Sequence, residues 1–263
     1  MTLRFLPRGL TLLTLLMLGG MPALASPVSQ PIPAASATAA GVASDATAGL
    51  VLELPPLLRL AGLPPEPGSR ALEDDLAILR WLQANRTPQM VASTWTMLGR
   101  DPTVFSPAIG VDMAKTTPRI ETALRQFLAL VDAACNQIKN RIRRPRPYLS
   151  HGDLHPCLPP ETGFSFPSGH SSWYTAAGHL LADLLPERRE RLLELGGHGA
   201  ASRVMCGVHY PSDVAAAQRF AAAAAAQIIA SPQWQRLRRD PAVLAELAQV
   251  RQARPEALPL LVR

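Results

Sequence analysis

The sequence predicts an all-α fold, a single-domain helical bundle, on three grounds. Apolar residues recur along several stretches at the three- and four-residue spacing of an amphipathic helix, and no stretch alternates as a half-buried strand does. Aromatic residues make up only 5% of the 263 residues, whereas alanine and leucine are abundant, which favours helices over a β-sandwich. Hydrophobic residues account for 48% of the chain, enough to bury a sizeable core in one domain.

Residues 1–25 have the features of a secretory signal peptide. Two arginines precede an apolar run, and Ala23–Ala25 supplies the small residues of a cleavage site before Ser26. The run is shorter than the roughly 20 residues that span a bilayer, so an uncleaved membrane anchor is the weaker interpretation. Cleavage removes two of the 26 basic residues and none of the 20 acidic ones, so the net charge falls from +6 to +4. We therefore expect a periplasmic, modestly basic protein without a membrane segment.

Residues 26–68 separate this signal from the helical domain, which is predicted over residues 69–263. The stretch from Ser26 to Gly49 is rich in proline, alanine and serine and is nearly uncharged, as is typical of a disordered tether. The next stretch, "LELPPLLRLAGLPPEPGS", is studded with proline. We therefore expect it to be extended and to lie on the domain surface.

The helical domain begins with a helix predicted after Ser69, where leucines recur at helical spacing behind acidic residues. A longer helix is predicted from Thr117 to Arg141, with Thr117 as its cap and Pro118 in its first position. One face of it is apolar, and the proline-rich "RRPRPY" ends it. Further helices are predicted over residues 168–185, 187–206, 211–230 and 241–250, the last with Asp240 as its cap.

Three polar clusters interrupt this helical scaffold. The first is Lys139 followed after six residues by Arg146-Pro147, the second is "PSGH" ending at His170, and the third is "SRVMCGVHYPSD". Arginine forks and lysine bind phosphate oxygens, and backbone N–H groups at a helix start favour anions. The clusters together predict a phosphate site whose donors are Lys139, Arg146, Arg203 and the amides of Ser168 and Gly169.

The third cluster also contains a histidine–carboxylate pair. His209 and Asp213 are four residues apart, which places them on one face of a helix that starts there. A carboxylate that accepts the proton of one ring nitrogen leaves the other nitrogen free to attack phosphorus. Alone, His209 has a plainer interpretation as a core histidine, and the arginines as surface charges. Their combination predicts catalysis, with His170 left as the proton donor.

The three clusters, taken in order from Lys139 to Asp213, resemble the signature of the superfamily that joins type 2 phosphatidic acid phosphatases and vanadium haloperoxidases. Every signature position matches. The secretory signal, the "LPPEP" segment, the length and the "SRVMCGVHYPSD" context look like the bacterial class A non-specific acid phosphatases, over most of the mature chain. The resemblance implies the all-α fold of that family.

The same resemblance implies hydrolysis of phosphate monoesters, with broad specificity, through a phosphohistidine intermediate. His209 would attack phosphorus, Asp213 would hold its ring, and His170 would protonate the leaving alkoxide and then activate water. Phosphate oxygens would be bound by Lys139, Arg146, Ser168, Gly169 and Arg203. Such a site needs no metal or other cofactor, accepts small phosphomonoesters and is inhibited by vanadate. A homodimer is left open, and no basic stripe with interleaved aromatics points to nucleic acid.

Three other functions share parts of this pattern. A lipid or isoprenoid (pyro)phosphatase of the same superfamily has the motifs, but such proteins look like bundles of membrane spans. No mature segment here has the roughly 18 uninterrupted apolar residues of a span. A vanadate-dependent haloperoxidase has the same anion pocket, typically on a much longer chain. A non-enzymatic phosphate-binding protein is disfavoured by the intact His209–Asp213 pair.

Several other polar residues are expected to have structural roles. Three arginines beside the first cluster are predicted to be surface charges: Arg141, Arg143 and Arg144. Another trio resembles a set of metal ligands, although no fourth ligand is evident: His151, His155 and Cys157. We expect its loop to shape the mouth of the pocket instead.

The chain has three cysteines, and an odd number in an oxidising compartment leaves at least one without an intramolecular partner. Cys135 lies on the apolar face of its helix and is predicted to be a buried thiol. Cys157 and Cys206 both flank signature motifs and are the favoured pair, although the sequence alone leaves that disulfide open.

Overall fold

The structure, a computed structural model, describes residues 45–254. The predicted signal peptide and residues 26–44 of the predicted tether lie outside this range. Within it the regular elements are helices and none is a strand, which confirms the all-α prediction. The elements are α1 (Leu54–Ala61), α2 (Arg70–Asn85), α3 (Pro88–Thr96), η1 (Pro102–Phe105), α4 (Ser106–Ile109), α5 (Met113–Thr116), α6 (Pro118–Ile142), α7 (Pro147–Ser150), α8 (Gly169–Leu184), η2 (Pro186–Arg188), α9 (Arg189–Met205), α10 (Pro211–Ala230), α11 (Pro232–Arg239) and α12 (Pro241–Gln252).

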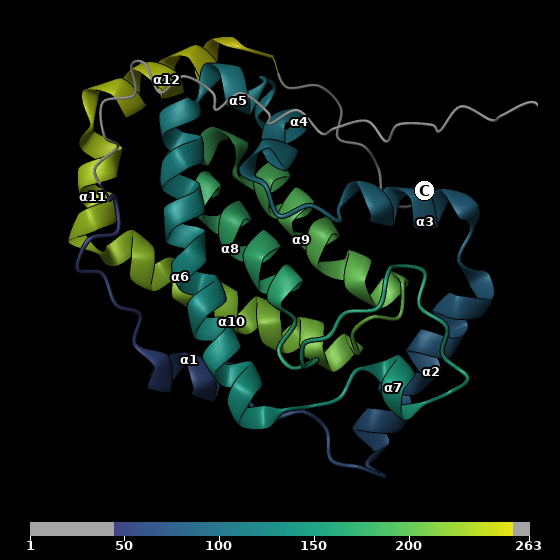
Figure 1. Ribbon diagram of the computed structural model, residues 1–263. Coiled ribbons are helices and arrows are strands. Elements are labelled where there is room, and N and C mark those ends of the chain that lie inside the picture. Colours follow the sequence, from purple (N-terminus) through teal and green to yellow (C-terminus); the bar gives the residue numbers. More distant parts are fainter. Residues whose placement is uncertain (1–44, 255–263) are drawn as a thin grey trace, which may run out of the picture. The chain divides into compact units, whose positions relative to one another are not determined.

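Helix α8 is the centre of the bundle, packed against α6, α9 and α10 (Figure 1). Its closest neighbour is α9, because glycines on both helices let the backbones approach. A Cβ added to Gly178 would lie 2.8 Å from the Leu192 carbonyl oxygen, and one added to Gly196 would lie 2.8 Å from the Tyr174 carbonyl oxygen. Neither distance is tolerated, so larger side chains would force the two helices apart.

The predicted helices are found within a few residues of their expected ends. Ser69 caps α2 by accepting a hydrogen bond from the Leu72 amide, and Asp240 caps α12 through the amides of Ala242 and Val243. These caps satisfy N–H groups that have no partner within their own helix. Local signals of this kind were therefore sufficient to find the long helices.

The prediction that Thr117 caps α6 with its side chain is wrong. The Thr117 hydroxyl does not accept from the helix but donates to the Met113 carbonyl oxygen, 3.1 Å away. The free amides of Arg119 and Ile120 instead donate to the Glu246 carboxylate of α12, at 2.9 and 3.0 Å. A tertiary contact has thus taken the place of the local cap, and a carboxylate also suits the positive end of the helix.

The segment predicted to be extended, residues 26–68, contains a helix in its described part. Helix α1 carries two prolines in its first turn, where a missing N–H costs no intrahelical hydrogen bond. Leu57 and Ala61 of this helix are fully buried, and α1 packs against α10. The expectation of an extended surface segment is therefore wrong for Leu54–Ala61, and the helical unit begins before residue 69.

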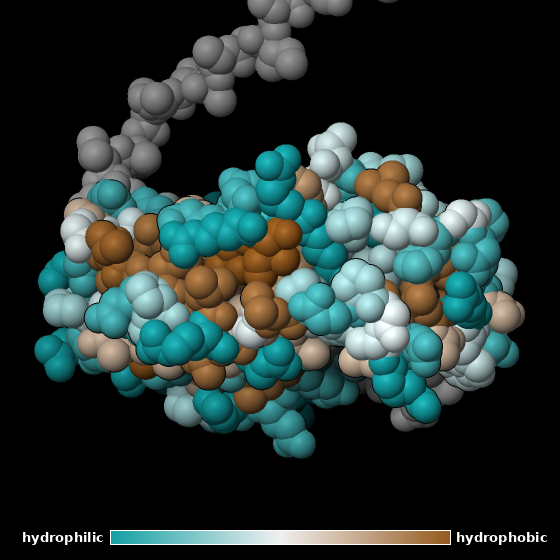
Figure 2. All heavy atoms as spheres, turned by 90° about the horizontal axis from the view of Figure 1, so that it is seen from below, coloured by the Kyte–Doolittle hydropathy of each residue, from teal (hydrophilic) through white to brown (hydrophobic). Residues whose placement is uncertain are grey.

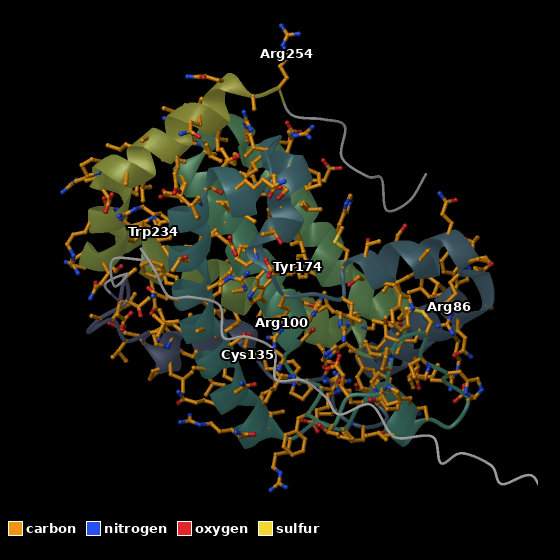
Figure 3. All side chains as sticks on the ribbon, turned by 45° about the horizontal axis from the view of Figure 1, so that its top comes forward. Arg86, Arg100, Cys135, Tyr174, Trp234 and Arg254 are labelled. Carbon is orange, nitrogen blue, oxygen red and sulfur yellow. A yellow bond between two sulfur atoms is a disulfide. The ribbon has the colours of Figure 1, made fainter. Side chains whose placement is uncertain are left out.

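The four-residue helices α4, α5 and α7 were not predicted, and neither were the longer helices α3 and α11. Each of the two longer helices begins with a proline that follows a capping residue, Thr87 for α3 and Ser231 for α11, a signal that the sequence does contain. Helix α11 carries the buried Trp234 (Figure 3). The Trp234 ring meets that of Phe127 edge-on, with centroids 5.1 Å apart. This contact ties the C-terminal helices to α6.

The surface of the described unit mixes apolar and polar side chains. Figure 2 shows hydrophobic residues gathered in patches among hydrophilic ones on one face. The large exposed hydrophobic residues come from several helices, including α1, α2, α3, α7 and α12. Among residues 45–254 no single helix is long and apolar enough to cross a membrane, although α10 and α11, bent by 67°, pass such a test as a pair.

Candidate active site

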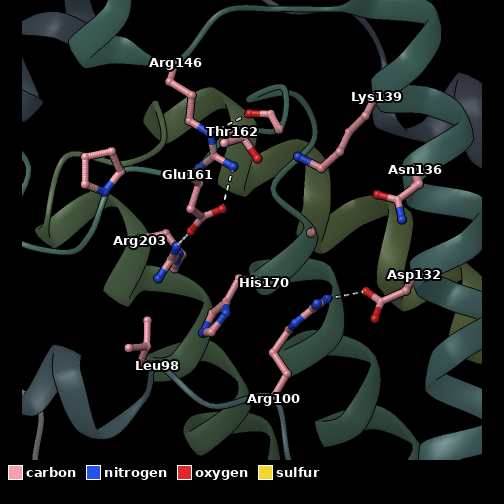
Figure 4. Close-up of a pocket in the computed structure, with 13 residues that line it drawn as sticks. Leu98, Arg100, Asp132, Asn136, Lys139, Arg146, Glu161, Thr162, His170 and Arg203 are labelled. Atoms are coloured by element: carbon pink, nitrogen blue, oxygen red, sulfur yellow. Dashed lines mark hydrogen bonds and ion pairs between the residues drawn. The ribbon is translucent and has the colours of Figure 1, made fainter.

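A pocket of about 530 Å³ opens between α6, the start of α8 and the end of α9 (Figure 4). Three connecting segments complete its wall: the turn that follows α3, the residues between α6 and α7, and the loop before α8. The lining residues are Leu98, Arg100, Asp132, Asn136, Lys139, Arg146, Pro160, Glu161, Thr162, Gly163, Gly169, His170 and Arg203. Five of the eight residues predicted for the site are among them, from all three polar clusters.

Three buried cations form one end of this pocket. Lys139 lies in the last turn of α6, and its Nζ donates to the Phe164 carbonyl oxygen at 2.5 Å. Burial, more than any neighbouring charge, lowers its pKa to about 8. Arg146 is held by the carbonyl oxygens of Gly163 and Val208. The chain thus holds positive side chains in place here, away from water.

Arg203 is the cation whose buried hydrogen-bond donors are left without partners. It is 1% exposed, and its Nε and Nη1 have no hydrogen-bond partner among the described residues. Burial, and to a lesser extent the charge of Arg146, lowers its pKa to about 10. Buried donors without partners are costly, and at a functional site they indicate a place for a ligand. The matching ligand is an anion with several oxygens.

Glu161 occupies part of this place, and the sequence analysis missed it. Its carboxylate binds Arg146 Nη2 at 2.6 Å and also Arg203 Nη2 (Figure 4). The side chain is 39% exposed, whereas the arginines are buried. Its two oxygens stand in for two oxygens of an anion. The only signal for it in the sequence is an acidic residue in the "PPETG" loop just before "PSGH".

His209 lies just before α10, which begins at Pro211 as predicted. The helix therefore does not start at His209, as the four-residue spacing of the His209–Asp213 pair had suggested. His209 Nδ1 is 3.3 Å from Asp213 Oδ2, and its Nε2 is 2.9 Å from Arg146 Nη1. Burial lowers its pKa well below the usual range, and Arg146, Lys139 and Arg203 lower it further. The ring is therefore neutral, with the proton on Nδ1 and the lone pair of Nε2 directed at Arg146.

Asp213 is fully buried and held by several donors. Arg144 Nη1 donates to Oδ1 at 2.7 Å, while the Ser165 hydroxyl and the Tyr210 amide donate to Oδ2 at 2.5 and 2.9 Å. Burial raises the pKa of this carboxyl group, and Arg144 opposes the rise. Such a carboxylate has one fixed orientation, in which Oδ2 also faces His209.

Arg144 had been predicted to be a surface charge, and that prediction is wrong. It is 8% exposed, and its guanidinium lies over the Tyr210 ring, 3.7 Å from the centroid. Besides Asp213 it contacts Asp75 of α2, which in turn accepts from the Ser212 amide at 2.9 Å. Helix α2 is thereby connected to the start of α10. The burial of Arg144 depends on carboxylates about 70 residues away in sequence, which no local pattern reveals.

The "PSGH" motif forms the start of α8 as predicted. Ser168 caps the helix by accepting from the Ser171 amide, but its own amide donates to the Asp213 carbonyl oxygen at 3.2 Å. The Ser168 amide is therefore not one of the free donors of the pocket in this structure, unlike the expectation. Gly169 does line the pocket, next to Lys139.

His170 faces the pocket from the first turn of α8. Its Nε2 is 2.6 Å from the Met97 carbonyl oxygen, so this nitrogen carries a proton and Nδ1 is the one left for other partners. Its ring packs against Tyr174. Burial is the main reason that its pKa falls to about 4, so the ring takes up a second proton only in acid.

The candidate metal ligands have other roles. Cys157 forms a disulfide with Cys206, with Cα atoms 4.7 Å apart, which confirms the favoured pair. His151 packs edge-on against Tyr210, and no cluster of potential metal ligands occurs within residues 45–254. The loop of residues 151–157 does not line the pocket, contrary to expectation; residues 160–163 do. Cys135 is a buried free thiol, as predicted.

Comparisons with known proteins identify a family and several relatives. A family model described as the PAP2 superfamily matches residues 123–238. A non-specific acid phosphatase from Providencia stuartii is 30% identical over 190 residues, or 68% of this chain and 76% of that protein. A decaprenylphosphoryl-5-phosphoribose phosphatase from Mycolicibacterium smegmatis is 41% identical over 85 residues, or 32% of this chain and 45% of that protein. A solved transmembrane PAP2 type phosphatidylglycerolphosphate phosphatase from Bacillus subtilis is 23% identical, with a TM-score of 0.44, over 60% of this chain and 84% of that one.

Proposed function

The chain belongs to the PAP2 superfamily, and from this membership we propose that it is an acid phosphatase that hydrolyses small phosphate monoesters through a phosphohistidine. The observation that carries the proposal is the cluster of Lys139, Arg146 and Arg203 beside a neutral histidine. The two unpartnered donors of Arg203 and the carboxylate of Glu161 mark where the oxygens of a phosphate would lie. Phosphoryl transfer requires mainly positioning and neutralisation of charge, which such a cluster supplies.

In the first step the phosphate group displaces Glu161 and is bound by the three cations. His209 Nε2, released from Arg146, attacks phosphorus and forms the N–P bond while the bond to the ester oxygen breaks. That oxygen takes a proton from His170. Asp213 keeps the Nδ1 proton of His209 in place and its charge stabilises the cationic phosphohistidine.

In the second step water releases the phosphate. His170, now neutral, accepts a proton from the attacking water, and the new P–O bond replaces the N–P bond. The electron pair of that bond returns to Nε2, so both histidines regain their starting states. The low pKa of His170 fits an enzyme that works in acid, because the first step needs its protonated form.

The test is hydrolysis of p-nitrophenyl phosphate by the purified mature chain in the presence of EDTA. We expect activity in EDTA and strong inhibition by vanadate, since five-coordinate vanadate resembles the transition state and such analogues bind far more tightly than substrate. Loss of activity in EDTA that zinc or magnesium restores would contradict the proposal. The proposal includes export to the periplasm. N-terminal sequencing of the exported protein should then find Ser26 as its first residue.

A second candidate is the dephosphorylation of a lipid or isoprenoid phosphate. It is favoured by the 41% identity to the decaprenylphosphoryl-5-phosphoribose phosphatase, over 85 residues. Comparison of a prenyl phosphate in detergent with a soluble phosphomonoester, both at the same concentration, separates the two candidates. The polar lining of the pocket leads us to expect faster hydrolysis of the soluble ester.

A further inference from the structure

We propose that Arg100, Asp132 and Asn136 form a subsite for the leaving group, and that it selects hydroxylated alcohols such as polyols and sugars. The inference rests on the proposed function, because a leaving group lies here only if its phosphate is bound by the three cations. These three residues belong to none of the three polar clusters of the sequence. They line the same pocket, at the end away from Arg146 and Arg203 (Figure 4).

The position of the subsite follows from the geometry of α6. Asp132, Asn136 and Lys139 are separated by four and three residues, so they share one face of the helix. At a rise of about 1.5 Å per residue, Asp132 lies roughly 10 Å along the axis from Lys139. His170, the predicted proton donor, lies across the pocket from this face, beside Arg100 (Figure 4). An alcohol that leaves toward His170 therefore has its carbon chain alongside Asn136 and Asp132.

The chemistry of the subsite is that of hydroxyl recognition. Arg100 Nη1 donates to Asp132 Oδ1 at 2.7 Å, while Oδ2 of this carboxylate and the carboxamide of Asn136 have no hydrogen-bond partner among residues 45–254. Together they offer acceptors for hydroxyl protons and donors for hydroxyl oxygens. Of the lining side chains only Leu98 and Pro160 are hydrocarbon. Side chains that form hydrogen bonds outnumber them, which favours a hydroxylated leaving group.

The turn that carries Arg100 is fixed by side chains of α8. The Tyr174 hydroxyl donates to the Gly99 carbonyl oxygen at 2.8 Å, and His170 Nε2 contacts the Met97 carbonyl oxygen at 2.6 Å. The Tyr174 ring fits only because residue 199 is glycine, since a Cβ there would lie 2.0 Å from a ring atom. The subsite is thus attached to the same helix as the proton donor, and is formed in advance of binding.

The test compares two esters that differ only in hydroxyl groups, glycerol 3-phosphate and n-propyl phosphate. The full mature chain should hydrolyse the glycerol ester with a kcat/KM about three- to tenfold above that of the propyl ester, the scale of one net hydrogen bond to the partly buried Asp132 or the exposed Asn136. In Asp132→Asn and in Asn136→Ala this ratio should fall about two- to fivefold, toward one. A ratio within each variant cancels any general loss of activity.

The matched control is Asp74→Asn, which makes the same change in an exposed arginine–aspartate pair away from the pocket, with Arg70 2.9 Å away. It should leave the ratio as in the wild type. A wild-type ratio near one, or an undiminished ratio in both pocket variants, would overturn the subsite while hydrolysis of the propyl ester leaves the proposed function standing. Hydrolysis of neither ester, nor of p-nitrophenyl phosphate, would overturn both.

Discussion

Two arginine–carboxylate clusters lie within the same site, and they differ in how completely their hydrogen bonds are satisfied. In the closed cluster, Arg144 bridges two buried carboxylates, Asp213 and Asp75. In the open cluster, Arg146 and Arg203 share one half-exposed carboxylate, that of Glu161, and Arg203 keeps two donors without partners. The closed cluster has two carboxylates for one arginine, whereas the open cluster has two arginines for one carboxylate.

This difference separates the cluster that positions a catalytic side chain from the cluster that would bind phosphate. A buried network that is fully paired has a single arrangement, and the closed cluster uses it to orient the carboxylate behind His209. A buried cation with unpaired donors costs the folded protein free energy, and an anion that pairs with those donors removes this cost. The open cluster is therefore where phosphate would bind. Ionic contacts that look alike in a sequence thus have opposite roles. The arginine and Glu161 variants below each change one cluster without the other.

The largest difference is expected between Arg203→Met and Arg144→Met. Arg203→Met should lower kcat/KM by a hundred- to a thousandfold, roughly the effect of losing one donor to a developing oxyanion, with little change in the free energy of unfolding. Arg144→Met strands two buried carboxylates and should cost about 3–5 kcal/mol of stability. Denaturant unfolding and p-nitrophenyl phosphate kinetics measure both. Equal losses of stability in the two variants would contradict the distinction.

The next effect concerns the proton donor, which belongs to neither cluster. His170→Gln should lower kcat for glycerol 3-phosphate by about a hundredfold, because general-acid help contributes roughly that factor or more for a poor leaving group. The loss for p-nitrophenyl phosphate should be much smaller, since p-nitrophenolate leaves without a proton. Equal losses for both esters would show that His170 does not donate to the leaving oxygen.

His170 should also affect how stability depends on pH. Burial lowers its pKa from the usual 6.5 to about 4, so the unfolded chain takes up its proton first as the pH falls. Stability therefore declines between pH 6.5 and 4 and recovers as the pH rises. In His170→Gln this part of the decline should be absent, which thermal unfolding across that range can measure. An unchanged slope in the variant would contradict the burial of a neutral ring.

The smallest effect is expected from Glu161→Gln, which weakens the internal competitor of phosphate. The inhibition constants of inorganic phosphate and vanadate should fall by about three- to tenfold, the scale of a half-exposed ion pair. Asp153→Asn, which alters an exposed pair with Arg80, is the control and should leave both constants unchanged. Weaker inhibition in Glu161→Gln would mean that this carboxylate assists phosphate binding.

The sequence predicted best what depends on neighbours along the chain. Helix starts at Ser69 and Asp240 were found because capping is a local interaction, and the three polar clusters were found because their spacing is fixed. Arg144 and Glu161 were missed, since the burial of one and the position of the other depend on contacts with distant residues. Helix α1 was missed because prolines that start a helix look locally like prolines that prevent one.

The central claim is that His209 is the nucleophile, and trapping of the covalent intermediate tests it most directly. A radiolabelled phosphomonoester is mixed with the enzyme, the reaction is quenched rapidly, and the labelled residue is mapped. The account predicts a base-stable, acid-labile label on His209, and no label or turnover in His209→Ala, which should still bind phosphate through Lys139, Arg146 and Arg203. A label on Ser168 or Ser202, or normal turnover in His209→Ala, would contradict it.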